Sequence, residues 1–353
     1  MDEYGAVDVD SGAALSTGPI PPLDTGSVAP SPTESTEPSV PAFPEHTVVR
    51  RRVGLSDLHV FPLALNGNVF GWTADAPTSD AVLDRFAAAG GQLVDTADAY
   101  AGGRSEIIIG NWMRSRRNRE AVVVATKVGK GPDHPGVTSP AIAAAVHDSL
   151  RRLRTDRIDL LSLHVDDPSV DFGETLLAVD RLIRAGDVRW FGASHHSGDR
   201  LIEARIASAQ LGVAPMVALQ NQYNLVFRTE YEGGLERVVR DLRLGFLPRF
   251  GLAGGFLSGK YRTRADLTGG RRRGELGRFG TRTGWRVLAV LDEVAAEHEV
   301  STAAIALAWL LLKPGVVAPV VSASAPDQVA DLVAATTVVL TRQQLAALDR
   351  ASA

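Results

Sequence analysis

The chain has 353 residues, of which 45% are hydrophobic, and a formal net charge of −4. This length predicts one large domain or two ordinary ones, and the hydrophobic content is sufficient for a sizeable core. The absence of cysteine excludes a disulfide framework, thiol catalysis and a thiolate metal site, and it is expected of a protein in the reducing cytoplasm.

The first 47 residues differ in composition from the rest. They hold eight acidic residues, no lysine or arginine, and eight of the nineteen prolines, with many Ser and Thr. Such a segment buries too little apolar surface to offset its ordering entropy, and it lacks the basic and apolar regions of a signal peptide. We predict a disordered acidic tail over residues 1–47 and one domain over residues 48–353.

Removing the −8 of the tail from the total leaves a charge of +4 on the remainder. This mild bias argues against a dedicated nucleic-acid-binding protein. The longest apolar stretches are also shorter than the ~20 residues that a membrane-spanning helix requires. We therefore expect neither a nucleic-acid partner nor a membrane partner, and a cytoplasmic location.

From residue 48 onward, short apolar runs alternate with segments of helical periodicity. The first part, residues 48–59, predicts a strand pair or an edge turn at Gly54. Eight strands are then expected at residues 61–65, 92–94, 121–127, 158–163, 188–193, 216–219, 244–247 and 316–321. Helices are expected at residues 80–89, 106–114, 139–153, 173–185, 199–210, 230–242, 285–298, 301–312, 327–334 and 342–351, and a long loop at residues 249–283.

This order predicts an α/β fold of the (β/α)₈ TIM-barrel class. The strands are continuous apolar runs rather than alternating ones, which is typical of a parallel sheet covered on both faces. Eight strand-and-helix units are what a closed barrel requires. An open doubly wound sheet would normally carry G-x-G-x-x-G after its first strand, and the sequence at residues 66–71 does not match that motif.

Three successive predicted strands end in polar residues. These residues are Asp95, Lys127 and His164, and Tyr100 follows the first of them by five positions. The chain has only four lysines among its 37 basic residues, so a lysine at a strand end is notable. The carboxyl ends of parallel barrel strands converge on one face, where barrel enzymes hold their catalytic groups.

These four residues together indicate proton-transfer chemistry. A free phenol has a pKa of ~10, and a neighbouring ammonium group favours its ionised form. A carboxylate holds such an ammonium in place, and an imidazole can hydrogen-bond a carbonyl oxygen. The group of four thus offers a proton donor for a developing alkoxide, whereas a hydride would have to come from a cofactor.

The sequence at this point resembles the aldo-keto reductase family. The resemblance extends over residues 50–350 in the expected order. The motifs that carry it are Asp-Thr-Ala-Asp-Ala-Tyr at 95–100, Gly-Arg-Ser-Glu at 103–106, Ala-Thr-Lys at 125–127, Ser-Leu-Arg-Arg-Leu at 149–153, Thr-Asp-Arg-Ile-Asp-Leu at 155–160, Leu-His at 163–164, Gln-Asn-Gln-Tyr-Asn at 220–224 and Leu-Ala-Gly-Gly-Phe-Leu-Ser-Gly-Lys-Tyr at 252–261.

The resemblance implies a barrel that binds NADP(H) in extended form and reduces a small carbonyl substrate. Asp95, Tyr100, Lys127 and His164 correspond to the family's catalytic tetrad, with Tyr100 as the general acid and, in the reverse reaction, the base. The implied cofactor-binding residues are Gly67, Asn68, Ser194, His195, Gln220, Arg249, Phe250, Leu252, Gly254, Leu257, Lys260, Ser322, Ser324 and Gln328. No metal ligand is implied.

Two positions and one segment depart from the family pattern. His195 stands where the family usually has Asn, and Arg249 stands where an aromatic residue usually stacks on the nicotinamide, with Phe250 as its neighbour. A guanidinium plane can also stack on a ring. Residues 321–328 contain no basic residue for a 2′-phosphate, so NAD(H) is an alternative cofactor.

Other readings of individual residues stay open. His164, His195 and His196 with Asp166 and Asp167 could form the metal site of a hydrolase, but the first strand lacks the His-x-His pair of such barrels. A cofactor-binding regulatory subunit with little turnover is a second alternative. The seven arginines at 262–282 could form a solvated loop or a loop over the cofactor pyrophosphate. Phe70 and Trp72 could line the substrate pocket or lie in the core.

Overall fold

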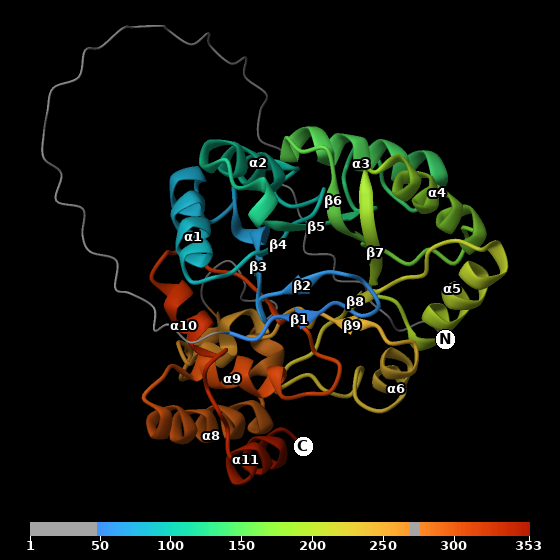
Figure 1. The fold of residues 1–353 in the computed structure, drawn as a ribbon. Helices are drawn as coiled ribbons and strands as arrows, with labels where there is room; N and C mark the ends of the chain where they lie inside the picture. Colours follow the sequence, from blue (N-terminus) through green and yellow to red (C-terminus); the bar gives the residue numbers. More distant parts are fainter. Residues whose placement is uncertain (1–47, 269–275) are drawn as a thin grey trace, which may run out of the picture. The chain divides into compact units, whose positions relative to one another are not determined.

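A computed structural model describes residues 48–268 and 276–353, which fall in one compact unit (Figure 1). The predicted tail at residues 1–47 lies outside the described residues. So do residues 269–275, which include three of the seven arginines in the predicted basic loop.

Eight parallel strands form one sheet in the order β10-β3-β4-β5-β6-β7-β8-β9. Bridges between Phe246 and Val316 and between Arg249 and Val320 join the two ends of this order. The structure thus confirms the predicted (β/α)₈ class. The strands are β3 (Ala64–Asn66), β4 (Leu93–Asp95), β5 (Val123–Val128), β6 (Ile158–Leu163), β7 (Val188–Ser194), β8 (Ala218–Gln220), β9 (Gly245–Phe246) and β10 (Val320–Val321).

Helices surround the strands, and Figure 1 shows α1 to α5 following one another around the outside of the sheet. The helices are α1 (Ala76–Ala88), α2 (Arg104–Arg116), α3 (Ser139–Leu153), α4 (Phe172–Ala185), α5 (Gly198–Leu211), α6 (Gly234–Asp241), α8 (Arg282–His298), α9 (Thr302–Leu311), α10 (Gln328–Ala334) and α11 (Arg342–Ser352). Short 3₁₀ helices are η1 (Gly67–Val69), η2 (Arg119–Ala121), η3 (Ala253–Ser258), η4 (Ala265–Thr268) and η5 (Gly277–Phe279).

Several boundaries differ from the prediction for local reasons. Helix α1 begins four residues earlier than expected, because the Asp75 side chain accepts a hydrogen bond from the Thr78 amide at 2.9 Å and caps it. Helix α6 begins four residues later than residue 230, after a series of turns that ends at Gly233. Strand β10 is short because Pro319 has no N–H for a strand ladder. The predicted loop at 249–283 contains η3, η4 and η5.

A hairpin of two antiparallel strands, β1 (Arg51–Arg52) and β2 (His59–Val60), covers the amino-terminal end of the barrel. Val53, Leu58 and Val60 are buried in one hydrophobic cluster with residues from β3 to β8. The turn at Gly54, as predicted, has a positive φ of 53°. A Cβ there would lie 2.1 Å from the Val217 carbonyl oxygen, so only glycine fits this close approach.

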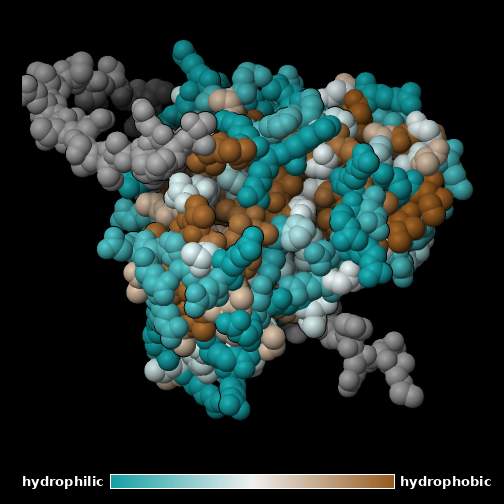
Figure 2. Space-filling model, turned by 60° about the horizontal axis from the view of Figure 1, so that its bottom comes forward, coloured by the Kyte–Doolittle hydropathy of each residue, from teal (hydrophilic) through white to brown (hydrophobic). Residues whose placement is uncertain are grey.

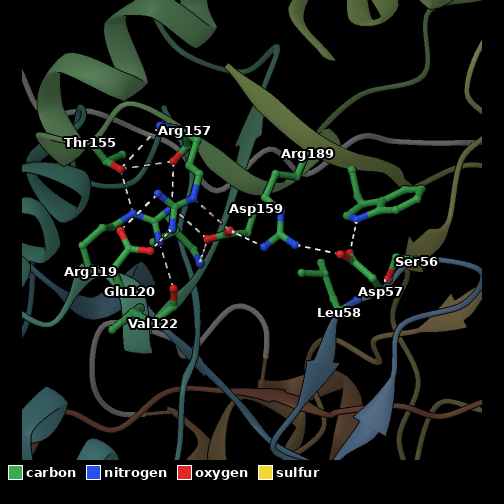
Figure 3. Close-up of polar contacts among 12 residues, drawn as sticks. Ser56, Asp57, Leu58, Arg119, Glu120, Val122, Thr155, Arg157, Asp159 and Arg189 are labelled. Atoms are coloured by element: carbon green, nitrogen blue, oxygen red, sulfur yellow. Dashed lines mark hydrogen bonds and ion pairs between the residues drawn. The ribbon is translucent and has the colours of Figure 1, made fainter. Parts of the chain in front are cut away.

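A network of charges at the same end centres on Asp159 of β6, which is 2% exposed (Figure 3). Its carboxylate accepts hydrogen bonds from the Arg119 guanidinium at 2.8 Å, the Val124 amide at 2.9 Å and the Arg189 guanidinium at 3.0 Å. Arg189 also reaches Asp57 in the hairpin at 3.0 Å. A single buried carboxylate thereby joins β5, β6 and β7 and, through Arg189, the hairpin.

The outer surface is mostly hydrophilic in the view of Figure 2. Hydrophobic side chains gather in places, including the side on which α5 lies in Figure 1, where Ile202, Ile206 and Leu211 are exposed. Among the described residues, no single helix is long and apolar enough to cross a membrane. Helices α8 and α9 reach that length only as a pair that is bent by 95°.

We expect Asp159→Asn to lower the free energy of unfolding by about 2 kcal/mol, because two guanidinium groups and one amide would lose a buried acceptor. Urea unfolding measures this change. Asp156→Asn is the matched control, since the Asp156 side chain is 84% exposed and its loss should cost under about 0.5 kcal/mol. Equal stabilities for the two variants would contradict this role of Asp159.

Candidate active site

The carboxyl ends of β4, β5 and β6 bring three of the predicted catalytic residues together. Asp95 is the last residue of β4, Lys127 is the penultimate residue of β5, and His164 directly follows β6. They are 2%, 1% and 8% exposed, respectively. The His164 amide donates to the Val128 carbonyl at 2.9 Å, which keeps the ends of β5 and β6 in register.

Lys127 and Asp95 form a buried ion pair. The Lys127 Nζ donates to Asp95 Oδ2 at 2.5 Å and to the Thr96 carbonyl at 2.7 Å. Burial disfavours the charged amine, but the Asp95 carboxylate and the Tyr100 hydroxyl outweigh this effect, so the pKa of Lys127 is raised. The lysine is therefore held as an ammonium group at neutral pH.

Tyr100 lies between the ion pair and His164. The Lys127 Nζ is 5.1 Å from the centre of the Tyr100 ring, and the ring centres of Tyr100 and His164 are 6.1 Å apart in an edge-to-face arrangement. The structure thus brings Asp95, Tyr100, Lys127 and His164, the tetrad, to one end of the barrel. A phenol next to an ammonium and an imidazole can deliver a proton to an oxygen atom.

The second carboxylate oxygen of Asp95 accepts a hydrogen bond from Gln220, a predicted cofactor-binding residue. The Gln220 side-chain amide donates to Asp95 Oδ1 at 2.9 Å. Gln220 in turn lies beside Ser194 across β7 and β8, and the Ser194 hydroxyl donates to the Gln220 carbonyl at 2.8 Å. Lys127 and Asp95 of the tetrad are therefore joined by a continuous series of hydrogen bonds to two of the predicted nicotinamide ligands.

His164 and His195 lie at the carboxyl end of the barrel, which we call the mouth, and both are neutral at physiological pH. Burial, followed by the positive charges of Lys127 and Lys130, lowers the pKa of His164 well below its usual value. Although His195 is exposed, desolvation of its ring and the charges of Arg249 and Lys130 lower its pKa to about 3. The ring centres of His164 and His195 are 6.1 Å apart with an interplanar angle of 29°. His195 adopts a left-handed backbone conformation with a φ of 61°.

The neighbouring His196 has a structural position. The His196 Nδ1 is 2.8 Å from the Ser194 carbonyl oxygen. The Asn221 side-chain amide donates to the His196 carbonyl oxygen at 3.0 Å. Asp166, a candidate metal ligand in the sequence, is hydrogen-bonded by Arg200 Nε at 2.9 Å. Within the described residues, no group of three or more His, Asp or Glu side chains could hold a metal ion.

Four of the predicted cofactor residues that follow β3 and β10 form two pairs. Ser322 donates its hydroxyl to the Asn68 side-chain oxygen at 2.6 Å, and so links the loops after the two neighbouring strands. The Ser324 amide donates to the Gln328 side chain at 2.8 Å. Gly67, before Asn68, accepts from the Ser105 hydroxyl at 2.8 Å through its carbonyl oxygen.

The remaining predicted cofactor residues lie after β9. The Arg249 and Arg278 guanidinium carbons are 5.9 Å and 5.7 Å from the centre of the Phe250 ring. Gly254 lies against that ring. Leu252 accepts hydrogen bonds from the amides of Gly255 and Leu257. The Leu257 side chain is fully buried, whereas Lys260 is exposed with its Nζ 5.0 Å from the centre of the Tyr261 ring.

Three buried polar atoms near the strand ends have no partner in the described structure. His164 Nδ1, Asn221 Oδ1 and Gln222 Nε2 are buried polar atoms with no hydrogen-bond partner among the described residues. Buried polar atoms are normally hydrogen-bonded, so these three are candidate partners for a bound polar group. A carboxamide offers both the donors and the acceptor that such atoms require.

The sequence reasoning did not identify some supporting residues. Glu106 of α2 is fully buried and accepts from the Thr126 hydroxyl and from Arg152 Nε, each at 2.6 Å. This carboxylate fixes α2 and α3 against the strand that carries Lys127. Phe70 lies in the core, and Trp72 is 47% exposed beside a cleft that Arg104 and Ile107 also line.

Comparison with known proteins adds a family match. The family model described as "Aldo/keto reductase family" matches residues 64–353 of the chain. This range contains the whole tetrad and all the predicted cofactor-binding residues.

Several relatives have similar sequences over most of the chain. The aldo-keto reductase ausK of Aspergillus calidoustus is 31% identical over 83% of this chain and 78% of its own length. The uncharacterized oxidoreductase YrpG of Bacillus subtilis is 30% identical over 84% and 94%. Norsolorinic acid reductase B of Aspergillus parasiticus is 28% identical over 84% and 82%.

The lowered pKa of His164 predicts a pH dependence of stability. Below pH ~6.5 the unfolded chain binds a proton at this histidine that the folded chain does not, so stability is lost as the pH falls. We expect the parent to lose about 1.4 kcal/mol more per pH unit than His164→Gln in urea unfolding between pH 6 and pH 5. His59→Gln is the control, because His59 is an exposed residue of the hairpin. Parallel curves for the parent and His164→Gln would rule this effect out.

Proposed function

We propose, from the premise that the chain belongs to the aldo/keto reductase family, that it is an NAD(P)H-dependent carbonyl reductase that converts an aldehyde or ketone to an alcohol reversibly. The observation that carries the proposal is the buried Lys127–Asp95 ion pair beside the Tyr100 ring. The reductases among the relatives support an oxidoreductase in general.

In this proposal Tyr100 donates its phenolic proton to the carbonyl oxygen of the substrate as negative charge develops there. The Lys127 ammonium stabilises the phenolate that is left, and Asp95 keeps the ammonium in position. His164, neutral at physiological pH, donates a hydrogen bond from one ring nitrogen to the same oxygen. In the reverse direction the phenolate removes the proton of the alcohol.

The nicotinamide cofactor supplies the hydride when bound. Ser194, His195 and Gln220 are the proposed ligands of its carboxamide end, and Asn221 adds a buried oxygen there. The linked Asn68 and Ser322, with Gly67 beside them, and the pair of Ser324 and Gln328 are proposed to bind its other parts. The segment after β9 is proposed to lie against the ring and the pyrophosphate, through Arg249, Phe250, Leu252, Gly254, Leu257 and Lys260.

We propose NADP(H) as the cofactor, with NAD(H) as the alternative. A regulatory subunit with little turnover is the second candidate, and the altered positions His195 and Arg249 are the observation that favours it. Both functions require cofactor binding, but only the reductase requires the proton donor. The cytoplasmic location and the absence of membrane and nucleic-acid partners stay predictions of the sequence.

Tyr100→Phe tests the reductase directly. We expect this variant to lose about 10²- to 10³-fold in the single-turnover rate with NADPH and 4-nitrobenzaldehyde, because the proton donor is removed. Its affinity for NADPH should not change. Tyr231→Phe is the matched control, since Tyr231 is a buried tyrosine whose hydroxyl has no partner among the described residues. A full rate for Tyr100→Phe would show that another group donates the proton, and no rate in the parent would favour the regulatory subunit.

A titration with NADPH and NADH, followed by quenching of tryptophan fluorescence, tests the cofactor choice. We expect a preference for NADPH of less than about tenfold, because residues 321–328 contain no Lys or Arg to pair with a 2′-phosphate. A preference of a hundredfold or more would mean that a basic residue from elsewhere binds that phosphate.

A further inference from the structure

The turn that follows β5 is attached to the loop that carries Tyr100. The Gly129 amide donates to Asp98 Oδ2 at 3.0 Å, and the Asp98 amide donates to the Lys127 carbonyl at 2.9 Å. The Gly136 amide closes the loop on the Gly129 carbonyl at 2.9 Å. Asp98 is 4% exposed, so these bonds lie in a buried environment where they are strong. The backbone on one side of Lys130 is therefore fixed.

The other side of Lys130 is fixed as well. A Cβ on Gly131 would lie 2.8 Å from Asp98 Oδ2, which shows that the Gly131 backbone packs directly on the carboxylate. Burial raises the pKa of Asp98 to about 6, and the amides of Gly129 and Gly131 partly oppose this effect. The carboxylate is thus ionised at neutral pH and holds both neighbours of Lys130.

This turn lies next to the tetrad. Val128, two residues before Lys130, accepts the amide of His164, and Lys127 precedes Val128. The positive charge of Lys130 contributes to the lowered pKa values of both His164 and His195. Lys130 is exposed and forms no ion pair within the described part of the chain.

Two of the carboxylates near this mouth are paired with cations. Asp95 is bound by Lys127, and Asp166, after β6, is bound by Arg200. Asp98 lies beneath the turn with its Oδ2 on the Gly129 amide. His164 and His195 are neutral, and Arg249 adds positive potential to both. Lys130 and Arg249 thus supply positive charge to the mouth above the tetrad.

We propose that Lys130, on the turn that Asp98 fixes beside His164, binds an anionic group of the carbonyl substrate, namely a carboxylate. This inference rests on the proposed function and names its substrate class. An ammonium group on a long side chain pairs with a carboxylate over a range of geometries, so the anionic group and the carbonyl can belong to one small molecule. The positive mouth also raises the local concentration of anionic substrates.

Two aldehydes of similar size test the proposal. 4-Carboxybenzaldehyde carries the anion, whereas 4-nitrobenzaldehyde is neutral. Calorimetry on the NADP⁺ complex, which has no hydride to transfer, measures the affinity for each aldehyde, and steady-state kinetics with NADPH measures each KM. We expect Lys130→Met to raise the Kd and KM for 4-carboxybenzaldehyde by about three- to tenfold. The Kd and KM for 4-nitrobenzaldehyde should stay within about twofold of the parent values.

Arg114→Met is the matched control, because it removes one exposed cation from the last turn of α2, at the opposite end of the barrel. It should leave the ratio of the two affinities unchanged. Raising the salt concentration should reduce the preference of the parent for the carboxylate and leave Lys130→Met unaffected.

An equal loss for both aldehydes in Lys130→Met, or no preference for the carboxylate in the parent, would overturn the proposal. Because calorimetry does not need turnover, the outcome separates from that of the reductase. Selective binding of 4-carboxybenzaldehyde without reduction would contradict the proposed function and retain the anion site. Reduction of both aldehydes with equal affinity would retain the proposed function and overturn the anion site.

Discussion

The buried ion pair between Lys127 and Asp95 is the interaction on which the carboxyl end of the barrel depends. Removing two charges from water is costly, and the cost is offset only when every polar atom finds a partner. Lys127 meets this condition through Asp95 and the Thr96 carbonyl, and Asp95 meets it through Lys127 and Gln220. The pair therefore requires β4, β5 and β8 to end at the same level, which is a property of the closed barrel.

The two ends of the barrel differ in how their buried polar groups are satisfied. At the amino-terminal end, Asp159 is surrounded by guanidinium groups and an amide, and the hairpin covers the core beneath it. At the carboxyl end, buried polar atoms such as His164 Nδ1 and Asn221 Oδ1 have no partner among the described residues. The first arrangement stabilises the fold, and the second leaves groups available for ligands.

The positions that depart from the family pattern lie together in the structure. His195 stacks near His164, and Arg249 and Lys130 both act on the two rings. Because both imidazoles are neutral, the positive charge at this mouth is carried by Lys130 and Arg249. A mouth of this kind favours anionic ligands.

The sequence by itself determined the barrel and predicted that Asp95, Tyr100, Lys127 and His164 lie at one end of it. Continuous apolar runs marked the strands, and Asp95, Lys127 and His164 stood at or next to their ends, where local pattern is informative. It did not give the starts of α1 and α6, where a capping side chain and a series of turns set the boundary.

Only the tertiary structure decided which side chains support the site. Asp95 and Gln220 are 125 residues apart, Arg152 and Glu106 are 46 apart, and Gly129 and Asp98 are 31 apart. Periodicity and motifs report on neighbours along the chain, whereas these bonds exist because the closed sheet brings distant strand ends together. The turn that carries the exposed Lys130 is another example, because the bond between the Gly129 amide and Asp98 fixes it and no local sequence pattern reports that bond.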